Sequence, residues 1–144
     1  MNGWLLDTNV LLELNRPRPD TKVVAFVGAQ PLDRLFVSTV ALAEIRFGIE
    51  QVTDPSRRAG LHHWLTYQVR PMFDGRVLAI SEDVMVAWRL MVEEGRKARH
   101  TFPQPDLIVA ATAAVHGLTI VTRNRADFVQ AGARVFNPWV DRAP

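Results

Sequence analysis

Five short apolar runs, separated by stretches with helical signals, constrain the fold of this chain more than any other feature. They lie at residues 4–6, 35–37, 77–80, 119–122 and 134–136. Strands this short and apolar are typical of a parallel sheet buried on both faces, because parallel strands need crossover connections that cover the sheet. The pattern therefore predicts an α/β fold with a short central parallel β-sheet flanked by helices, in a Rossmann-like three-layer arrangement.

Helix-end signals occur between these runs. Asp20 and Ser38 are predicted N-caps, since a short side-chain oxygen there accepts a backbone N–H of the first turn. Pro105 is expected at the first position of a long helix that Gly117 ends. Residues 52–75 form the longest stretch without a strand, and we interpret them as a helical excursion from the sheet.

Length and composition indicate one globular domain. At 144 residues the chain has the size of a single domain, which we predict to span residues 1–144. Its content of 48% apolar and 22% charged residues is ordinary and excludes disordered and low-complexity classes. The chain has no cysteine, which excludes zinc–thiolate sites, thiol catalysis and disulfide frameworks, and which fits a reducing compartment.

Charge and hydropathy favour a soluble protein. The 17 Lys and Arg residues against 15 Asp and Glu leave a formal charge of +2, which permits a nucleic-acid partner without requiring one. The N-terminal segment lacks the basic residues of a secretory signal, and Asp7 interrupts its apolar run. The longest nearly apolar stretch, residues 107–121, is broken by His116 and Gly117 and is shorter than the roughly 20 residues of a membrane span. We therefore expect a cytoplasmic protein with no membrane partner.

Acidic side chains near the carboxyl ends of the predicted strands are the first candidates for a site, because ligands of parallel sheets bind there. Asp7 directly follows the first strand, which we predict to be central, although Asp7 would also serve as a helix cap. Glu44 lies in a mostly apolar helix with no cation three or four positions away. It therefore needs a metal, or a long-range arginine, to neutralise it.

Two later segments add polar side chains to the same edge. Asp106 is expected at the start of the helix over residues 107–116, where the helix dipole alone would favour an acid. Thr122, Asn124 and Asp127 follow the fourth predicted strand and are placed at the same rim. A loop and a helix cap are the alternative interpretation of this last group.

Together these acids predict a metal site. Three or four carboxylates from distant parts of the chain at one edge of a sheet repel one another and need a cation. Oxygen ligands without cysteine favour Mg²⁺ or Mn²⁺ over zinc. Such an ion is suited to phosphoryl-transfer and phosphodiester chemistry.

The motifs, taken in order, resemble those of the PIN-domain ribonucleases, and in particular of the VapC-type toxins of bacterial toxin–antitoxin pairs. Four segments are similar to motifs of that family, and two more are similar to its FitB-like branch. The four are residues 5–10, 38–48, 106–113 and 119–124, and the two are residues 71–78 and 135–139. The resemblance therefore covers nearly the whole chain.

This resemblance implies a metal-dependent endoribonuclease. It assigns metal binding to Asp7, Glu44 and Asp106, with Mg²⁺ as the cofactor and Mn²⁺ as a substitute. The family often has aspartate where this chain has Asn124, so Asp127 is expected to join the other three as the fourth catalytic acid. The resemblance also implies a VapB-type antitoxin, a homodimer, and cleavage of tRNA or another structured RNA to leave 5′-phosphate and 3′-hydroxyl ends.

Two further groups are candidates for supporting roles. The candidates for holding the acids or contacting substrate are Thr8, Asn9, Thr122 and Asn124. The candidates for binding the RNA backbone are Arg96, Lys97 and Arg99, which shortly precede Asp106. A solvated helix end with dipole-favoured cations is the alternative interpretation of this basic run.

Three other functions stay open. A receiver-like or flavodoxin-like binding module also has acids at strand tips, but the middle strands here end at Ser38 and Ser81, where a receiver would have its phosphoacceptor aspartate. Residues 7–9 are not the glycine-rich loop of a mononucleotide-binding fold. The same acids would serve a structure-specific DNA nuclease. A degenerate domain that binds RNA or an antitoxin without cutting is compatible with the amide at Asn124.

Overall fold

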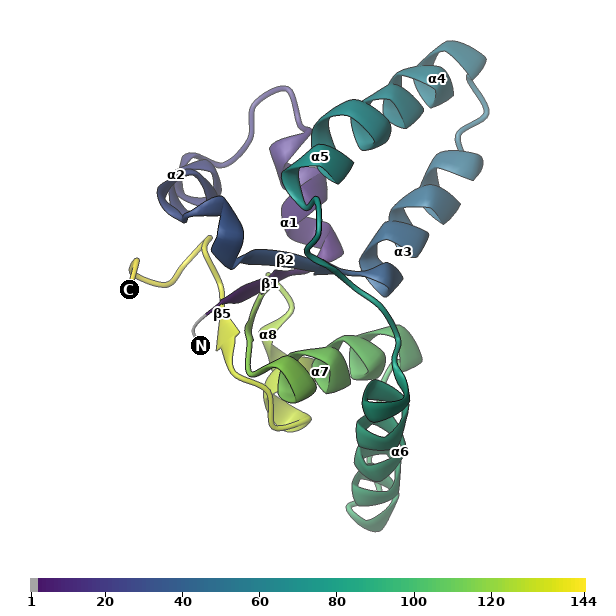
Figure 1. The fold of residues 1–144 in the computed structure, drawn as a ribbon, viewed down its shortest axis with the longest axis vertical. Coiled ribbons are helices and arrows are strands. Elements are labelled where there is room, and N and C mark those ends of the chain that lie inside the picture. The colour runs from purple at the N-terminus through teal and green to yellow at the C-terminus, as the bar shows by residue number, and fades with distance from the viewer. Residues whose placement is uncertain (1–2) are drawn as a thin grey trace.

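Five parallel strands form the centre of the molecule (Figure 1). The computed structural model describes residues 3–144, so Met1 and Asn2 of the predicted domain lie outside the described residues. The strands are β1 (Trp4–Leu6), β2 (Leu35–Ser38), β3 (Val77–Leu78), β4 (Thr119–Val121) and β5 (Val135–Phe136). They lie in the order β3-β2-β1-β4-β5, and all neighbouring pairs are parallel. The predicted α/β class and the central place of β1 are confirmed.

Helices cover both faces of this sheet. Figure 1 shows α1 to α5 on one side and α6 to α8 on the other. Their bounds are α1 (Thr8–Leu14), α2 (Thr21–Ala29), α3 (Thr39–Glu50), α4 (Pro55–Trp64), α5 (Arg70–Met72), α6 (Glu82–Lys97), α7 (Gln104–His116) and α8 (Arg125–Gln130). A 3₁₀ helix, η1 (Leu32–Arg34), leads into β2, and a π-helical segment, η2 (Leu65–Val69), joins α4 to α5. No helix among residues 3–144 is both long enough and apolar enough to cross a membrane.

Alternate side chains of the strands enter two separate cores. Leu6 and Val121 lie in the core beneath α1 to α5, whereas Leu5 and Ile120 lie in the core beneath α7 and α8. In the sheet register, Leu5 is aligned with Phe36 on one side and with Ile120 on the other. Both faces of the sheet are therefore buried, as its short apolar strands predict.

The helix ends follow the local sequence signals. Asp20 accepts the backbone N–H of Lys22 at 2.8 Å, and Ser38 accepts that of Ala41 at 3.1 Å. Gly117 ends α7 in the left-handed conformation, with φ of 66°. The predicted helical excursion consists of α4, η2 and α5. These local signals set where the helices begin and end, and hence which residues lie at the carboxyl edge of the sheet.

Candidate active site

The topology brings four segments to the carboxyl edge of the sheet. β2 and β3 lie in sequence order on one side of β1, and β4 pairs with the opposite side of β1. Such a reversal of strand order opens a crevice at the carboxyl ends of the two strands involved. Asp7 directly follows β1, and Thr122 directly follows β4. Helix α3 starts from the carboxyl end of β2 and carries Glu44, whereas α7 runs back toward the start of β4 and holds Asp106 in its first turn.

Asp7 is both a helix cap and a member of the acidic site. Its side chain is 7% exposed, and its Oδ1 accepts the backbone N–H of Thr8 at 2.9 Å as the N-cap of α1. Its Oδ2 accepts the hydroxyl of Thr122 at 2.8 Å. Burial raises the pKa of Asp7, although these two hydrogen bonds lower it in part. The capping interpretation is therefore confirmed, and the metal-binding role of Asp7 stays a prediction.

Asn9 connects the two loops that meet at this crevice. Its amide nitrogen donates to the hydroxyl of Thr122 at 3.1 Å and to Oδ2 of Asp7 at 3.4 Å. Its amide oxygen accepts the backbone N–H of Arg123 at 3.2 Å. By contrast, the Thr8 hydroxyl is buried and has no hydrogen-bond partner among residues 3–144. The side chains of Asn9 and Thr122 thus orient Asp7 through hydrogen bonds. The hydroxyl of Thr8, the residue after Asp7, makes no such bond within residues 3–144.

Thr122 gives a first prediction. Thr122→Val should lower the free energy of unfolding by about 1–3 kcal/mol, because it leaves the backbone N–H of Asn124 without its acceptor at 3.0 Å and removes the shorter of the two bonds to Oδ2 of Asp7. Urea denaturation measures the loss. Thr112→Val is the matched control, since that buried hydroxyl donates only to the carbonyl of Ile108 in its own helix. Equal losses in the two variants would contradict the assigned role of Thr122.

Glu44 lies on the solvent side of α3, which corrects one step of the sequence argument. The buried side chains of α3 are Ala41, Leu42, Ile45 and Ile49, and Glu44 is exposed. Its pKa is nevertheless raised, first by partial burial and then by the negative charges of Asp7 and Asp106. Glu44 is therefore close enough to the other acids to interact with them electrostatically.

Asp106 has a strongly perturbed pKa for a surface-facing acid. Partial burial and the charges of Asp7 and Asp127 raise the pKa of Asp106 to about 6. The side-chain amide of Asn124 donates to its Oδ2 at 3.3 Å. Asp127 is placed in the first turn of α8 and contributes charge to the same cluster. The structure thus places the predicted acids close enough for the charges of Asp7 and Asp127 to act on Asp106, and Asn124 is a neutral contact of Asp106.

The donor set fits a hard divalent cation. None of the ion pairs formed within residues 3–144 includes any of the four acids, so their negative charge is not compensated by protein cations. Within the same residues, no three acidic or histidine side chains are arranged to hold an ion together. Mg²⁺ does not require three such side chains, because it keeps several waters and is usually bound through one or two carboxylates. The pKa values of Glu44 and Asp106, which burial and neighbouring carboxylates raise, agree with such a site.

The predicted RNA-binding residues have other contacts. Arg96 pairs with Glu93 at 3.0 Å and Lys97 pairs with Glu94 at 3.4 Å, both within α6. Arg99 follows the helix in the left-handed conformation, with φ of 57°, and is exposed. Hydrogen bonds and ion pairs in the described part of the chain do not connect these three to the acidic site. Their contact with RNA stays a prediction.

The loop after β4 is held by C-terminal residues that the sequence argument missed. The guanidinium of Arg123 lies 4.9 Å from the ring centre of Trp139, and Arg125 forms an ion pair with Asp141. These contacts restrain the loop that carries Thr122. No local signal identifies such pairs, because their partners are 16 residues apart without a common helix or strand.

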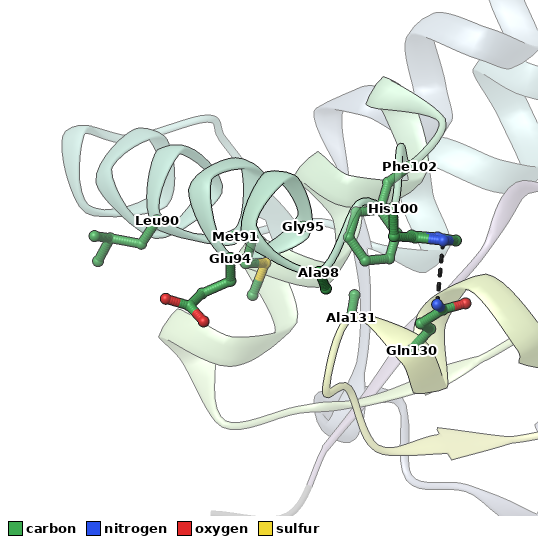
Figure 2. A pocket seen from close by; sticks show the side chains of 9 residues that line it. All are labelled: Leu90, Met91, Glu94, Gly95, Ala98, His100, Phe102, Gln130 and Ala131. Carbon is green, nitrogen blue, oxygen red and sulfur yellow. Dashed lines mark hydrogen bonds between the residues drawn. The ribbon is translucent and has the colours of Figure 1, made fainter.

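A separate cavity of about 380 Å³ lies between α6 and α8 (Figure 2). Met91, Phe102 and Ala131 contribute apolar lining, and the ring of His100 faces the amide of Gln130 at 3.1 Å. Its lining includes only one carboxylate, that of Glu94. The cavity therefore lacks the clustered acids of the crevice, and we place the candidate active site at the carboxyl edge of the sheet.

Fold and site together define a parallel α/β domain with clustered acids at its topological switch point. Residues 4–133 match the model of the PIN domain, and the chain belongs to this family. It is 34% identical to toxin FitB of Neisseria gonorrhoeae over 95% of this chain and 99% of that one. It is 33% identical to the VapC ribonuclease Y4jK of Sinorhizobium fredii, over 94% of this chain and 96% of that one.

Solved structures show the same likeness. The crystal structure of FitAcB from Neisseria gonorrhoeae has a TM-score of 0.90 and 34% identity, and the match covers 95% of this chain and 99% of that chain. The structure of FitAB bound to an IR36 DNA fragment has a TM-score of 0.90 and 32% identity, with 96% and 97% coverage. The family resemblance inferred from the motifs is confirmed.

Proposed function

We propose that this protein is a Mg²⁺-dependent endoribonuclease, for which Mn²⁺ can substitute, and the toxin of a type II toxin–antitoxin pair. The observation that carries the proposal is the cluster of Asp7, Glu44, Asp106 and Asp127, which has no compensating protein cation within residues 3–144. The relative named VapC ribonuclease Y4jK supports the nuclease activity, and the relative named toxin FitB supports the role as a toxin. The expected substrate is tRNA or another structured RNA.

In this proposal, Asp7, Glu44 and Asp106 hold the metal. When bound, Mg²⁺ supplies a Lewis acid that makes a water nucleophilic and stabilises the charge of the leaving 3′ oxygen. Thr122 and the backbone of Thr8 fix the orientation of Asp7. The carboxylate of Asp7 is therefore already oriented before the reaction and does not have to reorient during it.

The remaining residues complete the acidic crevice. Asn124 donates to Oδ2 of Asp106, and the other oxygen of that carboxylate accepts no hydrogen bond from residues 3–144. Asp127 lies close enough to influence the charge of Asp106 and is the proposed fourth acid. The reaction requires no serine, histidine or cysteine nucleophile, because water is the attacking group and a carboxylate of the cluster can accept its proton.

The proposed partners are a VapB-type antitoxin and a second copy of the chain. The toxin–antitoxin complex from Klebsiella pneumoniae, in which the matching chain is 25% identical to this one with a TM-score of 0.66, supports the antitoxin. The exposed apolar side chains of Met85, Val86 and Leu90 on α6 support a contact with a second copy, because water-exposed apolar clusters mark interaction surfaces. Since cellular RNA is the proposed substrate, the proposed place of action is the cytoplasm.

Cleavage of total cellular RNA by the purified protein tests the function. With Mg²⁺ or Mn²⁺ we expect discrete new 5′ ends, and with EDTA we expect none. DNA of the same sequence as the cleaved RNA separates the ribonuclease from a DNA nuclease. A folded protein that binds the metal but cuts neither nucleic acid would instead establish a degenerate binding domain and overturn the proposal.

A further inference from the structure

An apolar groove lies directly beside the acidic crevice. It has a volume of about 450 Å³, and Glu44 is part of its wall. The other lining residues are Thr39, Val40, Ala43, Phe47, Ile80, Gln104, Pro105 and Ile108. Groove and crevice therefore share the carboxylate of Glu44, and the groove adjoins the place where the acids would hold a phosphodiester.

Phe47 is the one aromatic residue among those that line the groove. Its side chain is 68% exposed, and it follows Glu44 by three residues on α3. Residues three apart are neighbours on one side of a helix, so the ring lies next to the acid. A phenyl ring in this position exposes apolar surface to water beside a charged site, and that surface is available to a flat partner.

Gln104 supplies a directed polar group to the same groove. Its Oε1 accepts the indole N–H of Trp88 at 2.9 Å. Because an indole nitrogen can only donate, this bond fixes which end of the amide faces Trp88. The amide NH₂ of Gln104 has no hydrogen-bond partner within the described chain, and it is the donor that the side chain can offer to a ligand.

We propose that this groove binds one unpaired nucleobase of the RNA, next to the phosphodiester that is cut. The base stacks on Phe47 and presents a hydrogen-bond acceptor to the amide of Gln104. The inference rests on the proposed function, because a phosphodiester held at the acids always has a base on each side. Proteins that recognise RNA bases do so on unpaired nucleotides, whose faces are free to stack on aromatic rings.

Single-base removal in the substrate tests this placement. A short single-stranded RNA containing the mapped cut site is compared with copies in which one base at a time is missing. For the wild type, we expect a loss of kcat/KM of about 10-fold or more at one position adjoining the cut. Phe47→Ala should show a similar loss on intact RNA and no further loss at that position, whereas Phe47→Trp should retain activity.

Two further variants sharpen the result. Tyr67→Ala is the matched control, since Tyr67 is an aromatic residue that is 67% exposed on η2 and does not line the groove. It should cleave like the wild type. Gln104→Glu keeps the acceptor for Trp88 but removes the donors, and it is expected to change which base is preferred at the same position.

The outcomes separate the inference from the function on which it rests. If the wild type cleaves RNA and Phe47→Ala cleaves it equally well, the base site is wrong and the function stands. If Phe47→Ala changes the oligomeric state while leaving kcat/KM unchanged, the groove is a contact between copies, which also overturns the base site. A wild type that cleaves no RNA overturns both.

Discussion

Asp7→Asn is expected to lower the rate of RNA cleavage about 1,000-fold while the fold stays intact, because several kcal/mol of metal-dependent stabilisation is lost. Asparagine keeps the shape of the side chain and is as good an N-cap as aspartate, so the bond from the N–H of Thr8 to Oδ1 survives. The amide replaces the charged oxygen that accepts from Thr122. Single-turnover cleavage with Mg²⁺ measures the loss, and circular dichroism checks the fold.

Asp20→Asn is the matched control for this experiment. Asp20 is also an N-cap, accepting the N–H groups of Lys22 and Val23 at the start of α2, and it has no contact with the acidic cluster. Asp20→Asn should leave the rate of cleavage within about twofold of that of the wild type, because asparagine caps a helix about as well as aspartate does. Cleavage by Asp7→Asn at the wild-type rate would refute the metal-binding role of Asp7.

Asp106→Asn is expected to stabilise the metal-free protein at pH 7 while abolishing cleavage. The pKa of Asp106 is raised to about 6 from an ordinary value of 3.8. The native state therefore binds more protons than the unfolded state between these values, and the stability of the wild type falls as the pH rises through them. Asparagine never ionises, so above pH 6 the variant should gain about 1–2 kcal/mol after solvent screening is allowed for.

Urea denaturation in EDTA at pH 7 and near pH 4 measures this gain. The advantage of Asp106→Asn should be present at pH 7 and should shrink as the pH falls below 6, where the wild-type carboxyl is protonated. Mg²⁺ should stabilise the wild type more than the variant, since only the native wild type has the full set of ligands. Asp74→Asn, at an exposed acid that makes no ion pair within residues 3–144, is the control. A variant less stable than the wild type at pH 7 would contradict the charge argument.

The sequence predicts the architecture well because its signals are local. Each strand is a short apolar run bounded by helix signals, and Ser38 and Gly117 are placed by caps whose chemistry acts within four residues. These features need no knowledge of long-range packing.

The details of the site depend on contacts that no local pattern contains. Asn9 meets Thr122 across 113 residues of sequence, and their partnership exists only once β1 and β4 are side by side. Glu44 belongs to the acidic cluster from the exposed side of α3, although its apolar neighbours favour burial. The position of Phe47 in the sequence does point to the groove, because this apolar residue lies outside the buried face of α3 formed by Leu42, Ile45 and Ile49.

The central position of the first strand has a consequence for protein synthesis. β1 leaves the ribosome before all other strands, but one of its two neighbours, β4, is among the last segments to be made. Asp7 cannot receive its bond from Thr122 until 115 further residues have been added. Sheets that depend on such distant pairings form late and slowly. A growing or truncated chain that ends before β4 therefore cannot assemble the acidic crevice, and the proposed cleavage of RNA would become possible only when translation is nearly complete.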